Sequence, residues 1–185
     1  MNIHWKSFFA GLCSLWLVGC GPAAKDDTIR IAVIPKGTTH EFWQSIHAGA
    51  RKAEKELTAQ GKSVEIIWKG PLKEDDRDQQ MGLVESFTVK GVDGIVLAPL
   101  DAKALVRPVE SAQKSGIPVV IIDSGLETTN YVSFVATDNL KGGEMAGDYM
   151  AQQLENRGKV ILLRYAVGSA STENRENGFL KALAK

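Results

Sequence analysis

The sequence predicts a doubly wound α/β fold, in which helices cover both faces of a parallel sheet. From Thr28 onward, short apolar runs alternate with longer segments whose apolar residues recur at helical spacing. Strands that are apolar on both faces are typical of parallel sheets buried between helices. The composition, with 44% hydrophobic and 24% charged residues, excludes a disordered or collagen-like chain.

The elements follow one another in a regular order, and local signals set their limits. Thr38 to Glu41 matches a capping box at the start of the first helix, and Gly61 marks its end. Asp101 is expected to cap the third helix, and Gly116 to end it. The expected strands are 29–35, 64–68, 94–98, 119–123, 132–136 and 159–164, and the expected helices are 41–60, 78–90, 101–115, 139–155 and 172–184.

Charge and motifs exclude several classes of function. Lys+Arg and Asp+Glu each number 22, so the chain lacks the basic excess that nucleic-acid binding requires. It has no dinucleotide fingerprint, P-loop or serine-hydrolase motif. His40-Glu41 begins like a zinc motif, but Gln44 stands where the second ligand would be. We therefore expect a binding protein and no enzyme, with no cofactor and no metal. The glycines of 141–147 are expected to pack a helix closely on the sheet.

The N-terminus predicts export and a lipid anchor. Lys6 precedes an apolar run, Phe8 to Val18, that is too short to span a bilayer. The run ends Leu-Val-Gly-Cys20, which resembles the bacterial lipobox. We expect a signal peptide over 1–19, a lipidated Cys20 and a tether over 20–27, which places the protein in the cell envelope or periplasm, anchored to a membrane. A plain signal peptide with a chance cysteine is the alternative.

Ligands of doubly wound folds bind at the carboxyl ends of the strands, where this chain carries aromatic and charged residues. Phe42 and Trp43 are about 100° apart around a helix, so both cannot point into the core. We expect Trp43, with Phe42 behind it, to offer a flat ring to a sugar; packing of both rings is the alternative. Asp123 and Asp138 are candidate acceptors for hydroxyl groups or else turn and cap residues, and Arg175 is a candidate donor or else a solvated residue.

These residues together resemble the periplasmic sugar-binding proteins of bacterial ABC importers, in particular the ribose-binding-like type I group. The resemblance runs from about Thr28 to the end and is most specific over 135–147, with support from 94–99, 116–123 and 175–179. It implies a periplasmic-binding-protein type I fold, a small sugar or polyol ligand held between two lobes, and an ABC permease as partner. It also implies an N-terminal lobe over 28–136 and an incomplete second lobe, truncated at its C-terminus, over 137–185.

The resemblance also implies a set of ligand-binding residues. Ser124 stands where ribose binders place an arginine, Ala98 where they place an asparagine, and His40 where an asparagine is common. These changes favour a larger sugar, a cyclitol or another small polar solute over ribose. A sensor feeding a chemoreceptor or histidine kinase is one alternative; the effector-binding domain of a LacI-type repressor, which requires an N-terminal helix-turn-helix, is another. The implied set is His40, Phe42, Trp43, Asp123, Ser124, Asp138 and Arg175.

Overall fold

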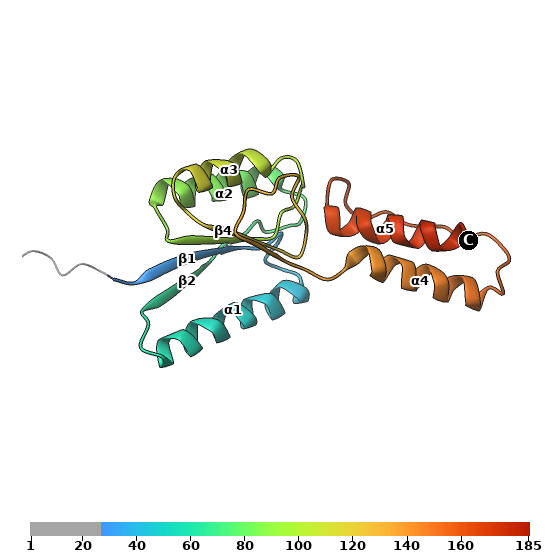
Figure 1. The fold of residues 1–185 in the computed structure, drawn as a ribbon, viewed down its shortest axis with the longest axis horizontal. Helices are drawn as coiled ribbons and strands as arrows, with labels where there is room; N and C mark the ends of the chain where they lie inside the picture. The colour runs from blue at the N-terminus through green and yellow to red at the C-terminus, as the bar shows by residue number, and fades with distance from the viewer. Residues whose placement is uncertain (1–26) are drawn as a thin grey trace, which may run out of the picture.

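The computed structural model describes residues 27–185, which form a parallel sheet flanked by helices (Figure 1). All pairings between neighbouring strands are parallel, which confirms the predicted α/β class. The strands lie in the order β2 (Val64–Trp68), β1 (Ile29–Ile34), β3 (Gly94–Leu97), β4 (Val119–Ile122) and β5 (Ser133–Val135). The helices are α1 (Glu41–Ala59), α2 (Arg77–Lys90), α3 (Val106–Lys114), α4 (Asn139–Gln153) and α5 (Ala170–Leu183).

The main core lies between the sheet and the helices α2 and α3, while α1 covers the other face beside β2 (Figure 1). Ile34, Leu97 and Ile121 are register partners on neighbouring strands, so their side chains point to the same face. There they pack with Val84 of α2 and Val109 of α3, and all five are fully buried. This register brings the carboxyl ends of β1, β3 and β4 to one edge of the sheet.

Beyond β5 the chain leaves the sheet, and α4 and α5 pack against each other beside it (Figure 1). The contact depends on glycines, because a Cβ at Gly143 would overlap the carbonyl oxygen of Arg175, and one at Gly147 would lie 2.6 Å from the carbonyl oxygen of Phe179. The expectation that 141–147 packs a helix on the sheet is therefore wrong. These glycines instead let two helix backbones approach each other.

The expected strand at 159–164 is absent, because these residues are irregular in the structure. Ile161 and Leu163 are 87% and 86% exposed. A strand is stable only beside a neighbour that pairs with its backbone, and no strand within residues 27–185 lies beside this segment. Apolar composition alone therefore did not suffice to form it.

Two helix starts also differ from the sequence-based expectation. The cap of α1 is His40, whose Nδ1 accepts a hydrogen bond from the Phe42 amide at 3.1 Å, and not a capping box on Thr38. The helix α3 begins at Val106 because residues 101–105 form turns ahead of it. The other limits agree with the predicted ones to within one or two residues.

Asp101 still acts as a cap, but of the turn ahead of α3. Its Oδ1 accepts hydrogen bonds from the amides of Lys103 at 2.9 Å and Ala104 at 2.8 Å. Its Oδ2 pairs with Nη1 of Arg77 at 2.7 Å. Burial on its own would raise the pKa of Asp101, but the two amides and the guanidinium outweigh it and hold the pKa below its usual value.

We expect Asp101→Ala to lower the free energy of unfolding by about 1–2 kcal/mol at neutral pH, because two amides and a guanidinium lose their acceptor. Since the folded-state pKa lies below the ordinary 3.8, the carboxylate stabilises the fold above that value and stops doing so as the pH falls through the folded-state pKa. Melting temperatures measured from neutral to acidic pH should therefore converge for the two proteins at low pH. A difference that stays constant would contradict this role.

No helix within residues 27–185 is both long and apolar enough to cross a membrane. The predicted signal peptide, Cys20 and the tether up to residue 26 lie outside the described residues.

Candidate functional site

A cavity of about 290 Å³ lies at the edge where β1 and β4 end and α5 begins. This is the place where doubly wound folds bind their ligands, so the predicted location and the observed cavity agree. The cavity combines aromatic, charged and hydroxyl side chains. Its lining consists of Lys36, His40, Phe42, Trp43, Glu74, Leu100, Asp123, Tyr165, Ala166, Ser169, Ser171, Thr172 and Arg175.

The two adjacent aromatic residues both reach the cavity, but in different roles. Trp43 is only 2% exposed, and its Nε1 donates a hydrogen bond to Oε1 of Glu74 at 2.5 Å. Phe42 is 46% exposed and meets Trp43 edge-on, with ring centroids 4.9 Å apart. The expected order, with Trp43 in front and Phe42 behind, is therefore wrong. Phe42 offers the accessible ring, and Trp43 forms a fixed wall.

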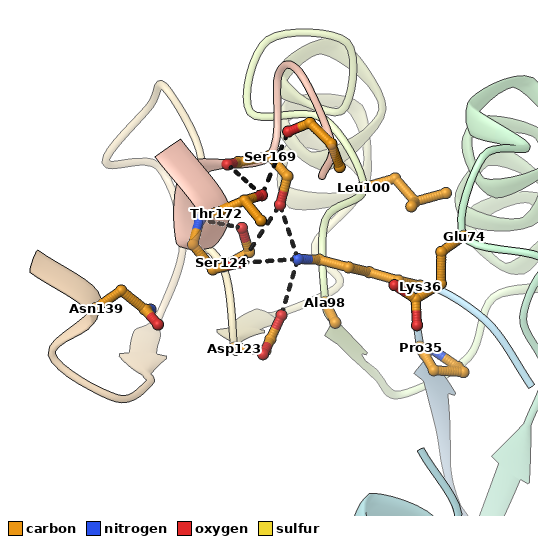
Figure 2. Close-up of polar contacts among 12 residues, drawn as sticks. Pro35, Lys36, Glu74, Ala98, Leu100, Asp123, Ser124, Asn139, Ser169 and Thr172 are labelled. Carbon is orange, nitrogen blue, oxygen red and sulfur yellow. Dashed lines mark hydrogen bonds and ion pairs between the residues drawn. The ribbon is translucent and has the colours of Figure 1, made fainter. Parts of the chain in front are cut away.

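Lys36 lies at the centre of the polar side of the cavity (Figure 2). Its Nζ lies 2.9 Å from Oδ2 of Asp123 and 3.0 Å from the hydroxyl oxygens of both Ser169 and Ser171. Asp123 adopts a left-handed backbone conformation with φ of 63°, a region in which Asp is tolerated better than most residues. This turn at the end of β4 directs the carboxylate toward Lys36.

Two of the predicted site residues lie elsewhere. Ser124 is 1% exposed and does not line the cavity; its Oγ instead accepts a hydrogen bond from the Ser171 amide at 3.0 Å. Asp138 caps α4, with Oδ1 accepting from the Lys141 amide at 2.9 Å, and it lines a separate surface pocket. The structure thus favours the cap alternative for Asp138. The predicted residues that it brings together are His40, Phe42, Trp43, Asp123 and Arg175.

Several cavity residues were not among those named from the sequence as ligand-binding residues. The hydroxyl of Tyr165 lies 3.3 Å from Oε2 of Glu74. The charge of Glu74, together with burial, raises the pKa of Tyr165, so the phenol stays protonated and able to donate. The only sequence signal for Lys36 was a charged residue directly after an apolar strand and Pro35.

The cavity has the properties of a binding site for a small polar solute. Its cationic side chains, Lys36 and Arg175, are matched by two carboxylates, Glu74 and Asp123. Hydroxyl groups of serines, Thr172 and Tyr165 add neutral donors and acceptors. Among residues 27–185, no group of three or more His, Cys, Asp or Glu side chains is placed to hold a metal ion.

A parallel α/β sheet with a polar cavity at the carboxyl ends of its strands is the arrangement in which doubly wound proteins bind small ligands. Residues 31–185 match the family model described as a periplasmic binding protein domain, and the chain belongs to this family. It is 35% identical to the ribose import binding protein of Bacillus subtilis, with 84% of this chain and 48% of the relative covered. It is 33% identical to the D-ribose/D-allose-binding protein of Pseudomonas aeruginosa, covering 83% and 49%.

A solved structure shares the arrangement of the elements. The carbohydrate transporter solute binding protein from Agrobacterium radiobacter, in complex with D-arabinose, is 35% identical, with a TM-score of 0.78 over 85% of this chain and 53% of that chain. The chain spans about half the length of the curated relatives it matches.

Proposed function

We propose that this chain is the extracytoplasmic solute-binding component of an ABC importer and that its cavity holds a small uncharged sugar or polyol. The observation that carries the proposal is the cavity, which is lined by the accessible ring of Phe42 together with equal numbers of cationic and anionic side chains. The relatives named for ribose, allose and arabinose support it. These names favour neither a repressor effector domain nor a sensor, and binding without chemistry is the activity that we assign.

The side chains suggest how a sugar is held. The C–H face of a sugar ring packs against Phe42, and its hydroxyl groups donate to Asp123 and accept from Arg175 and His40. Positive and negative groups balance, so an uncharged solute leaves no buried charge unpaired. A cavity of about 290 Å³ is near the lower limit for small-molecule sites, which favours a single sugar unit.

Closure of two lobes links binding to transport in this proposal. In this proposal residues 28–136 form the N-terminal lobe, and residues 137–185 belong to a second lobe. The segment before α5 already contacts the first unit, since the Ala102 amide donates to the carbonyl oxygen of Gly168 at 2.9 Å. Ligand binding stabilises the closed arrangement, and the permease recognises it.

A titration panel tests the function. We expect D-ribose, D-allose, D-arabinose or a cyclitol to raise the melting temperature of this chain in a saturable way, because a ligand that binds only the folded state stabilises it. Amide chemical shifts should change at residues 36–43, 123 and 165–175. Shifts produced by amino acids, with none produced by any sugar or cyclitol, would overturn the assignment.

We also propose that a lipid on Cys20 anchors the protein to a membrane, which the lipobox-like sequence before it supports. In cells, incorporation of labelled fatty acid should be abolished by Cys20→Ala. If neither the wild type nor Cys20→Ala incorporates the labelled fatty acid, the proposed lipid anchor is contradicted.

A further inference from the structure

Lys36 is a buried lysine whose hydrogen-bonding capacity is fully used. Its ammonium group has three protons and three acceptors. Two of them, on Asp123 and Ser169, can be followed in Figure 2, and the third is the hydroxyl oxygen of Ser171. The residue is 6% exposed. A charge this deeply buried requires such partners, so the position of the ammonium group is fixed.

The three acceptors come from two parts of the chain. Asp123 follows β4 in the sheet unit, whereas Ser169 and Ser171 lie at the start of α5. The ammonium group therefore links the start of α5 to the carboxyl ends of β1 and β4. Among residues 27–185, the only ion pair of the ammonium group is with Oδ2 of Asp123, and no group donates a hydrogen bond to the other carboxylate oxygen, Oδ1.

We propose that Lys36 determines the charge specificity of the cavity, an inference that rests on the proposed sugar-binding function. The ammonium already occupies the cation position beside Asp123. A hydroxyl group of a neutral sugar can donate to the free Oδ1, but the ammonium of an aminosugar at that place meets a second positive charge in a partly desolvated site. The cavity thus accepts uncharged polyols and rejects their amino derivatives.

Binding of D-ribose and D-allose, each beside its monoamino-deoxy derivatives, tests this specificity by calorimetry. The measured quantity is the ratio of the affinity for the neutral sugar to that for its best-bound amino derivative. In Lys36→Met we expect this ratio to fall at least about tenfold, since close charge pairs couple by that much or more. Lys103→Met, which removes a lysine whose side chain is 78% exposed, should keep the wild-type ratio.

Two further variants keep the test decisive. Lys36→Gln retains hydrogen-bonding groups without the charge, so its ratio should fall as well, even if Lys36→Met does not fold. Ser169→Ala removes one acceptor while Asp123 and Ser171 still hold the ammonium group, so this variant should still reject the amino derivatives. If the wild type binds neutral sugars but the folded Lys36 variants keep its affinity ratio, the proposed role of Lys36 is overturned and the proposed function is not. Failure of the wild type to bind any neutral sugar would overturn the proposed function itself.

Discussion

Gly143→Ala is expected to lower the free energy of unfolding by about 1–3 kcal/mol, the range found for overpacked contacts. The added Cβ would overlap the carbonyl oxygen of Arg175, so α4 and α5 must separate. The neighbouring Gly142 is the matched control, because a Cβ there meets nothing within 4 Å. Gly142→Ala should be neutral or stabilise the helix by up to about 1 kcal/mol.

Urea unfolding followed by circular dichroism measures both changes. Because Arg175 lines the cavity from the helix that Gly143 contacts, Gly143→Ala should also weaken sugar binding. Equal stabilities for the two variants would show that the close contact between α4 and α5 does not exist in solution.

The adjacent aromatics should respond in opposite ways. Trp43→Ala removes a side chain that is 2% exposed, and we expect it to lower the free energy of unfolding by about 3–5 kcal/mol. Phe42→Ala removes a ring that is 46% exposed, so its effect on stability should stay below about 1 kcal/mol. Its effect on sugar affinity should be large, about tenfold or more, because the stacking face is lost.

Thermal melts and titrations with D-ribose and D-allose separate the two effects. A Phe42→Ala protein that binds sugar as well as the wild type would remove the ring from the site. A Trp43→Ala protein that melts at the wild-type temperature would contradict the buried position of the indole.

The parallel sheet and its flanking helices were predictable because each strand and helix is specified by the pattern of residues within its own segment. Apolar runs such as Val119–Ile122, and the periodic segments that follow them, can be recognised in the sequence without knowledge of distant contacts. The segment 159–164 has a similar composition and yet forms no strand, because a strand also requires a neighbouring strand. Local pattern therefore indicates which segments are able to form strands, and pairing decides which of them do.

The candidate site was only partly predictable, for a related reason. Strand-end rules located Asp123 and the aromatic pair, but helical spacing could not decide which ring points inward. Lys36 acquires its role from Ser169 and Ser171, which lie 133 and 135 positions further along the chain. No local signal joins residues at such a separation. Ser124 and Asp138, expected to contact the ligand, instead hold the start of α5 and cap α4.

A crystal structure of this chain with D-allose or D-ribose bound tests the central claim most directly. The account predicts that the sugar ring lies against Phe42, that one hydroxyl group donates to Oδ1 of Asp123, and that Arg175 donates to the sugar. A sugar bound away from these three residues, or crystals in which the cavity stays free of sugar at saturating concentration, would contradict it.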